Sequence, residues 1–159
     1  MSGNADAGRR ARYADARERT RAVLHGESDP IARMATTVCL VREVMEQASF
    51  VGFYRVIAPG LLAIGPYQGP LACLRIPFER GVCGAAAREG RSQLVPDVHA
   101  FPGHIACDSR SNSEIVVPVY DAGGALMAVL DVDSIFFDAF DADDQLGLEA
   151  ICADLLTLT

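Results

Sequence analysis

Residues 114–133 contain two strand-like runs on either side of a glycine turn: Glu114-Ile115-Val116-Val117-Pro118-Val119-Tyr120, then Asp121-Ala122-Gly123-Gly124, then Ala125-Leu126-Met127-Ala128-Val129-Leu130-Asp131-Val132-Asp133. β-Branched residues favour a pleated strand, whereas Asp and Gly favour a tight turn. The pattern therefore predicts an antiparallel β-hairpin. Because an isolated hairpin is marginally stable in water, neighbouring segments must supply further strands and a covering layer.

The segments on both sides of the hairpin supply strands and helices. Ser28-Asp29-Pro30 is a helix-start signal followed by apolar residues at helical spacing, and the acidic run after Asp141 suits the start of a last helix that runs to about Leu158. Strands are predicted over 50–57, 61–64, 73–77 and 93–95, and a short helix over 81–89, ended by Gly90. Helix, antiparallel strands and helix together predict an α+β layered domain.

Size and charge exclude several classes of function. A chain of 159 residues is enough for one domain with its own core. Its net charge of −7 argues against nucleic-acid binding, which needs clustered cations, and no apolar run is long enough to predict a membrane span. No lysine is present, so no phosphate-binding loop of the Walker type can form.

The N-terminal residues and the cysteine count suggest how the chain is organised and where it works. Residues 1–26 are rich in arginine and are predicted to be a leader, partly disordered or helical, ahead of a domain over 27–159. The chain has five cysteines, an odd number, and opens without the apolar core of a signal peptide. We therefore expect a cytoplasmic protein with free or catalytic thiols, not a disulfide framework.

Acidic residues on the second strand of the hairpin are the first candidates for chemistry. Strand alternation puts Asp131 and Asp133 on one face, and Glu114 begins the partner strand. Three carboxyls in one pocket would raise the pKa of at least one of them and leave it protonated near neutrality. The alternative is a solvated strand face on a hairpin edge.

Three cysteines are the second set of candidates. Cys107 lies in a polar, turn-rich stretch where a thiol has no packing role, and Cys73 and Cys83 lie on both sides of another turn-rich segment. A loop thiol with two further thiols nearby can form a sulfenic acid and resolve it as a disulfide. Alternatively, Cys73 and Cys83 are small core residues, as we expect for Cys39 inside the first predicted helix.

Two histidines near Cys107 admit several interpretations. His99 and His104 can serve as bases for a thiolate, or they can simply form hydrogen bonds to the loop backbone. Together with Cys83 and Cys107 they also offer enough ligands for zinc, although the spacing does not match a standard zinc motif.

Several ordered blocks of the chain resemble one enzyme family, the GAF-domain reductases of free methionine-(R)-sulfoxide. The resemblance runs from about Phe50 to the C-terminus and is carried by Val51-Gly52-Phe53-Tyr54, Gly65-Pro66-Tyr67-Gln68-Gly69, Ala72-Cys73, Arg80-Gly81-Val82-Cys83-Gly84, Asp97-Val98-His99, Gly103-His104-Ile105-Ala106-Cys107-Asp108, Ser111-Asn112-Ser113-Glu114-Ile115-Val116-Val117-Pro118 and Val129-Leu130-Asp131-Val132-Asp133-Ser134. It implies a single GAF domain over 27–159, with a central antiparallel sheet, the N- and C-terminal helices on one face, and loops over a ligand pocket on the other.

The resemblance also implies roles for individual residues. Cys107 corresponds to the catalytic thiol, Cys73 to its resolving partner and Cys83 to a third cysteine that can join the relay. Glu114, Asp131 and Asp133 correspond to the acids around the sulfoxide oxygen. Phe50 and Tyr54 correspond to substrate-binding aromatics, although the family commonly has tryptophan where this chain has Phe50.

The resemblance further implies the reaction and its partners. The substrate is free methionine sulfoxide, the reductant is thioredoxin with its NADPH system, no cofactor is bound, and a homodimer is one expected assembly. The rival functions are a GAF-type sensor of a small molecule and a thiol redox sensor, neither of which turns over a sulfoxide.

Overall fold

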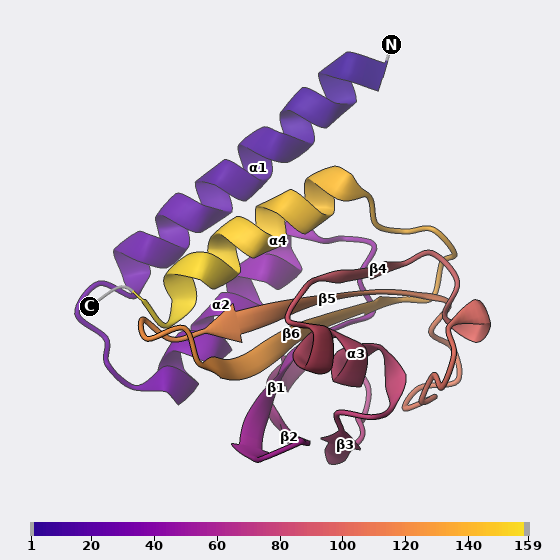
Figure 1. The fold of residues 1–159 in the computed structure, drawn as a ribbon. Coiled ribbons are helices and arrows are strands. Elements are labelled where there is room, and N and C mark those ends of the chain that lie inside the picture. The colour runs from indigo at the N-terminus through magenta and orange to yellow at the C-terminus, as the bar shows by residue number, and fades with distance from the viewer. Residues whose placement is uncertain (1, 158–159) are drawn as a thin grey trace.

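A computed structural model describes residues 2–157, and their side chains from residue 7 onward. The elements follow in the order α1 (Ser2–Val23), α2 (Pro30–Val44), β1 (Phe50–Ala58), β2 (Leu61–Gln68), β3 (Arg75–Pro77), α3 (Gly81–Glu89), β4 (Gln93–Val95), the short 3-10 helix η1 (Val98–Ala100), β5 (Ser113–Tyr120), β6 (Leu126–Ser134) and α4 (Ala142–Leu155). Figure 1 shows a central sheet with helices on both sides. The predicted α+β architecture is confirmed.

The strands form one antiparallel sheet in the order β3-β2-β1-β6-β5-β4. The predicted hairpin is present as β5 and β6, with Ile115 opposite Val132 and Val117 opposite Leu130. On the other side of β6, β1 places Phe50 opposite Asp133. The hairpin therefore lies in the middle of the sheet, and residues of β1, β5 and β6 are neighbours across it.

Two helices, α2 and α4, cover one face of the sheet with the larger hydrophobic core beneath them, and α1 packs on the outside of both. The side chain of Asp29 accepts a hydrogen bond from the backbone N–H of Ile31, so α2 begins where the sequence predicts. Asp141 and Asp144 form a capping box at the start of α4. Val51, Phe53, Leu130 and Val132 meet these helices, as strand alternation requires.

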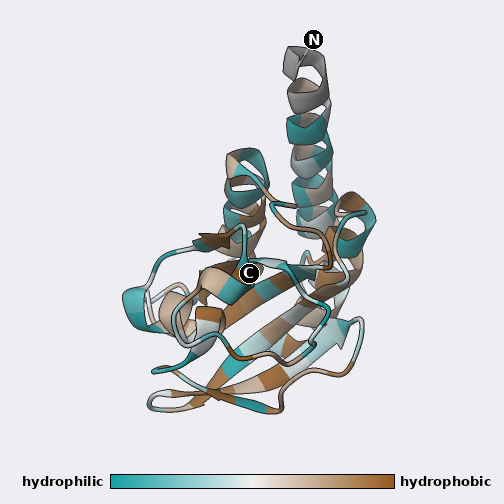
Figure 2. Cartoon of the chain, turned by 90° about the vertical axis from the view of Figure 1, so that its right-hand side faces the viewer, coloured by the Kyte–Doolittle hydropathy of each residue, from teal (hydrophilic) through white to brown (hydrophobic). Residues whose placement is uncertain are grey.

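The predicted leader contains α1, which lies along α4 (Figure 1). Hydrophilic bands alternate with paler ones along its described part in Figure 2. Tyr13 is buried and its hydroxyl donates to Asp144 over 2.8 Å, while Arg17 pairs with Asp154. A side chain at Gly147 would collide with the Tyr13 ring, so α4 keeps a glycine there. The division into 1–26 and 27–159 stays a prediction.

The opposite face of the sheet is covered by α3 and by the loops before β3 and after β4. α3 spans the predicted residues and ends at Gly90, which has a left-handed backbone (φ 65°). A second, smaller core packs here around Tyr54, Ile76 and Val116. Most of this layer is loop, so it leaves room that the helical layer does not.

One sequence prediction about a cysteine is wrong. Cys39 lies in α2, but its thiol is exposed at the surface instead of buried. The apolar positions of α2 define a buried face through Met34, Val38 and Val41, and Cys39 falls one residue outside it. Among the described residues no helix is long and apolar enough to cross a membrane.

Candidate active site

A pocket opens on the loop-covered face of the sheet, where β1, β5 and β6 run beneath α3. It holds about 510 Å³ of space, solvent at its mouth included. The lining residues are Phe50, Tyr54, Pro70, Leu71, Ala72, Ile76, Gly81, Val82, Cys83, His104, Ile105, Cys107, Asp108, Ser111, Glu114, Asp131 and Asp133. Seven of the eight site residues predicted from the sequence line this pocket, and the eighth, Cys73, is bonded to Cys107 at its wall.

The floor of the pocket carries the three predicted carboxyls. Glu114 lies opposite Asp133 in the β5–β6 ladder, and Asp131 is two residues before Asp133 on the same face of the sheet. Glu114 and Asp131 are buried, at 6% and 5% exposure. One oxygen of Asp131, Oδ1, is buried without a hydrogen-bond partner among the described residues. An unpaired polar atom in a pocket is a place where a ligand atom can bind.

Burial and mutual repulsion raise the pKa values of these acids. Burial raises the pKa of Glu114 well above its usual range, and the charges of Asp131 and Asp133 raise it further. Burial raises the pKa of Asp131 to about 6, and that of Asp133 well above its usual value. Because the three groups share one site, at least one proton remains there near neutral pH. The pocket can therefore act as a general acid.

Cys83 lies on α3 directly above the acids. Its thiol is buried and donates a weak hydrogen bond to Glu114 Oε1 over 3.9 Å. Burial raises the pKa of Cys83 well above the usual value, and the charges of Asp131 and Glu114 act in the same direction. Cys83 is therefore a neutral thiol at physiological pH and a poor nucleophile in this state.

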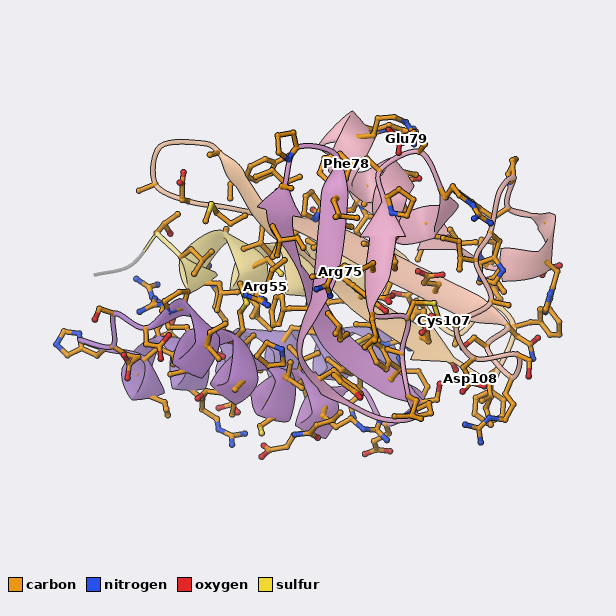
Figure 3. The ribbon with its side chains drawn as sticks, turned by 90° about the horizontal axis from the view of Figure 1, so that it is seen from below. Arg55, Arg75, Phe78, Glu79, Cys107 and Asp108 are labelled. Atoms are coloured by element: carbon orange, nitrogen blue, oxygen red, sulfur yellow. A yellow bond between two sulfur atoms is a disulfide. The ribbon has the colours of Figure 1, made fainter. Side chains whose placement is uncertain are left out.

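Cys73 and Cys107 form a disulfide, with their α-carbons 5.3 Å apart. Cys73 belongs to the loop between β2 and β3, and Cys107 to the long loop 101–112, where it lies beside Asp108 (Figure 3). The backbone N–H of Gly81 donates to the Gly103 carbonyl and ties that loop to α3. Gly81 has a positive φ of 72° and the Ile105 side chain packs over it, which favours glycine there.

Two aromatic rings wall the pocket from β1. Phe50 and Tyr54 are four residues apart on one face of the strand, and Phe50 stacks on Tyr67 with ring centroids 5.5 Å apart. A side chain at Gly52, between them, would lie 2.5 Å from Tyr67 Cβ and 2.8 Å from the Phe50 ring. Glycine at this position therefore lets Phe50 and Tyr67 close the wall over β1.

The two histidines have different surroundings. His99 Nε2 lies 2.8 Å from Asn112 Oδ1 and the residue is exposed. His104 lines the pocket with its Nε2 4.0 Å from Glu114 Oε2, and burial lowers its pKa, with a smaller contribution from His99. The expected hydrogen bonds from these rings to loop backbone are not formed in the described structure: His99 bonds a side chain instead.

Zinc ligands and other metal ligands can be tested on the same geometry. Cys107 is bonded to Cys73, so the predicted set of Cys83, His99, His104 and Cys107 is not brought together. Within residues 2–157, the cluster whose ligand atoms lie within 4.8 Å of one another is Cys83, Glu114 and Asp131. These groups all have raised pKa values, so a cation there would have to displace their protons.

Sequence reasoning gave no role to Asp108, which the structure places in the pocket wall. Its carboxylate accepts hydrogen bonds from the Arg110 side chain and backbone, and these bonds lower the pKa of Asp108. The spacing of Asp108 and Arg110 could have indicated this turn, since an Asp side chain commonly accepts a hydrogen bond from the backbone N–H two residues later. A fixed negative charge beside Cys107 is thus available to a cationic group of a ligand.

Comparison with known proteins agrees with this geometry. The family model described as GAF domain matches residues 16–156. The chain is 42% identical over 143 residues to the free methionine-R-sulfoxide reductase of Escherichia coli, covering 90% of this chain and 86% of that protein.

Solved structures give the same result. The Neisseria meningitidis free methionine-R-sulfoxide reductase, solved in complex with its substrate, matches with a TM-score of 0.85 and 42% identity over 90% of this chain and 85% of that chain. A putative GAF sensor protein from Burkholderia vietnamiensis matches with a TM-score of 0.88 and 44% identity over 93% of both chains. The chain therefore belongs to the GAF-domain family of free methionine-R-sulfoxide reductases.

Proposed function

We propose that this protein reduces free methionine-(R)-sulfoxide to methionine, with Cys107 as the attacking thiol. One observation carries the proposal: a disulfide between Cys73 and Cys107 borders a pocket whose floor holds three protonatable carboxyls, two of them buried. A sulfoxide reduction by thiols needs this combination, because it consumes a thiol pair and must protonate an oxygen. The relatives from Escherichia coli and Neisseria meningitidis support the choice of substrate.

In the first step the Cys107 sulfur attacks the sulfoxide sulfur. Oxide is prohibitively unstable as a leaving group, so an acid must protonate the oxygen as the S–O bond breaks. Glu114 is suited to this, because burial and the neighbouring Asp131 and Asp133 hold its proton in place near neutral pH. The protonated oxygen then passes from the substrate sulfur to the Cys107 sulfur as the bond between the two sulfurs breaks, so methionine leaves and Cys107 becomes a sulfenic acid.

In the second step Cys73 attacks the Cys107 sulfenic acid and releases water. The α-carbons of the two residues are already at disulfide distance, so no large movement of loop 101–112 is required to form this bond. Cys83 is a neutral thiol buried above Glu114 and can join the relay only after local movement. The structure thus favours Cys73 as the resolving thiol.

In the third step an external dithiol reduces the disulfide, and thioredoxin with its NADPH-dependent reductase is the proposed reductant. Cys73 and Cys107 are both partly exposed, so a sulfur is accessible to an attacking thiolate. No step of the scheme calls for a bound cofactor. The homodimer and the cytoplasmic location remain predictions.

The test is consumption of NADPH with thioredoxin, its reductase and each epimer of free methionine sulfoxide. Consumption with the (R) epimer and formation of methionine support the proposal. Failure to form methionine from either epimer with dithiothreitol as reductant would overturn it. Methionine formation with dithiothreitol, without NADPH consumption, would refute only thioredoxin as the reductant.

A thiol redox sensor is the second candidate, because a partly exposed disulfide can form without any sulfoxide. In that case peroxide would convert the reduced thiols to the Cys73–Cys107 disulfide, and methionine sulfoxide would not. Counting free thiols after each treatment separates the two functions. The three acids on the pocket floor favour the reductase, since a sulfoxide oxygen must be protonated as its bond to sulfur breaks.

A further inference from the structure

His104 lies between the solvent and the acids on the pocket floor. Its Nε2 is 4.0 Å from Glu114 Oε2, and its side chain is 16% exposed, against 8% for Glu114. It belongs to the same loop as Cys107, and both residues line the pocket. One ring edge therefore faces the proposed acid, while the residue also keeps a partial opening to the solvent.

The contrast with His99 argues against a structural role for His104. The ring of His99 is held by the side chain of Asn112, which in turn donates to the Ile135 carbonyl. Within residues 7–157 the ring nitrogens of His104 have no hydrogen-bond partner; the carboxylate that faces the ring is that of Glu114, with Oε2 4.0 Å from Nε2. A buried histidine that only braces a loop normally uses a ring nitrogen for a hydrogen bond.

The proposed chemistry leaves one proton to be moved. Cys107 must lose a proton to attack, and the acid must hold a proton to donate to the oxygen. The groups in direct contact with Glu114 are other acids and the neutral thiol of Cys83, which cannot collect a proton from Cys107. Glu114 itself is buried away from water, so recharging it needs a partner that can accept a proton and release it.

We propose that His104 relays the proton of the Cys107 thiol to Glu114. Glu114 gives its proton to the sulfoxide oxygen; one ring nitrogen of His104 accepts the thiol proton, and Nε2 returns a proton to the Glu114 carboxylate that the donation leaves. The sulfoxide sulfur gains two electrons as its S–O bond breaks, and the Cys107 sulfur loses two as its S–O bond forms. The sulfenic hydroxyl carries the proton that Glu114 donated and the thiol proton replaces it on Glu114, so atoms and electrons balance without another reactant.

The surroundings of His104 suit a neutral imidazole. His99 on η1 lies 6.4 Å from it between ring centroids, Glu114 faces it from β5, and Asp108 lies in the same loop. Burial lowers the pKa of His104 and His99 lowers it slightly further, so the ring is neutral near pH 7 and free to accept a proton. Asp131 and Asp133 act on Glu114 and hold its proton once it arrives.

The test measures a single turnover: reduced protein is mixed with free methionine-(R)-sulfoxide and the rate of methionine formation is followed. His104→Asn should lower the saturating rate about 100-fold, the lower end of what a placed proton-transfer group contributes, with the half-saturating substrate concentration changed less than about threefold. Added imidazole should raise the rate of methionine formation by His104→Ala at least about tenfold. His99→Asn is the matched control and should change the rate less than about threefold.

The inference rests on the proposed function, and the outcomes separate the two. If wild type forms no methionine, the proposed function fails. If wild type turns over and His104→Asn matches it, or if His99→Asn loses as much, the relay is refuted while the reductase stands. A loss confined to substrate affinity, or no rescue by imidazole in a His104→Ala protein that melts at the wild-type temperature, also refutes the relay.

Discussion

The two faces of the central sheet are built from the same strands but have different roles: one packs into the core, and the other lines the pocket. Along β6, Leu130 and Val132 point into the helix-covered core, where both are fully buried. Asp131 and Asp133, the residues that alternate with them, point into the pocket. A shift of one residue in this strand would exchange the two sets, so register alone decides which face is apolar and which is acidic.

The difference shows where stability is given up for chemistry. Burying an aliphatic side chain stabilises the fold by about 1.5–3 kcal/mol, whereas burying an unpaired carboxyl costs free energy unless it stays protonated. The cysteines divide in the same way. Cys152 is fully enclosed in the helix-side core, while Cys107 borders the pocket on a loop. The helical face therefore holds the fold together, and the loop-covered face holds the groups that we propose to react.

The largest expected effect comes from exchanging one sulfur on each face. Cys107→Ser should abolish methionine formation, because a serine hydroxyl is not ionised near neutral pH and cannot attack the sulfoxide sulfur. Cys152→Ser, in the helix-side core, should keep the turnover rate within about threefold and lower the melting temperature instead. Methionine assays and thermal melts on both variants check this. Turnover by Cys107→Ser would contradict the assignment.

Removing the proposed acid should give the next largest effect. Glu114→Gln keeps the shape of the side chain but cannot donate its proton to the oxygen, so the rate should fall about 100- to 10,000-fold. Because burial and neighbouring charges already disfavour the Glu114 carboxylate, the variant should be at least as stable as wild type near pH 8. Single-turnover rates and urea unfolding at that pH test both statements. If Glu114→Gln reacted at the wild-type rate, the general acid would have to be Asp131 or Asp133 instead.

Two adjacent residues of β6 should affect stability in opposite directions. Leu130→Ala leaves a cavity under the helices and should destabilise the protein by about 2–5 kcal/mol. Asp131→Asn replaces a buried carboxyl by an amide and should leave the free energy of unfolding near pH 8 unchanged or higher. Urea unfolding measures both. Comparable losses of unfolding free energy in the two variants would show that the two faces contribute equally to stability.

The acidic face should also set the pH dependence of stability. Asp131 has a pKa near 3.8 when exposed in the unfolded chain and about 6 in the fold, so between these values the folded protein binds more protons. Stability should therefore fall as pH rises from about 4 through 6. Glu114 and Asp133, whose folded pKa values are also raised, extend the fall to higher pH. Asp131→Asn should show a shallower slope in urea unfolding from pH 5 to 7, and an unchanged slope would contradict the raised pKa.

The sequence predicts most of this fold because local signals and tertiary structure agree. The hairpin turn, the Asp29 cap and the Gly90 stop each act within a few residues, and the strand and helix starts follow them closely. The faces of β6 follow from alternation alone. The contact of Cys73 with Cys107 follows from no local signal, because it joins loops 34 residues apart; only the resemblance to a known family indicated it.

Other features depend on packing that periodicity does not specify. Cys39 was expected to be buried, yet the rotation of α2 against β1 and β2 leaves it one position outside the buried stripe. The different roles of His99 and His104 were equally hidden, since both occur in one polar loop. Their different contacts depend on where Asn112, at the end of the loop, and Glu114, on β5, come to lie in the fold.

The smallest expected effect concerns the aromatic wall formed by Phe50 and Tyr67. This wall is an apolar packing surface, like the core, but it lies beside the acids of the pocket. The family resemblance implies tryptophan at the position of Phe50, whose ring is stacked on Tyr67 and which lies opposite Asp133 across β1 and β6. An indole at this position adds about 40 Å² of apolar surface, worth about 1 kcal/mol if the substrate's methyl and methylene groups cover it.

Phe50→Trp should then lower the KM for free methionine-(R)-sulfoxide about fivefold and leave kcat unchanged, because the ring contacts ground state and transition state alike. Steady-state kinetics with Tyr67→Phe as control test this, since that variant keeps the stacked ring. A raised KM in Phe50→Trp would mean that Tyr67 and Gly52 leave no room for the larger ring, and that the wall was already closely packed around phenylalanine.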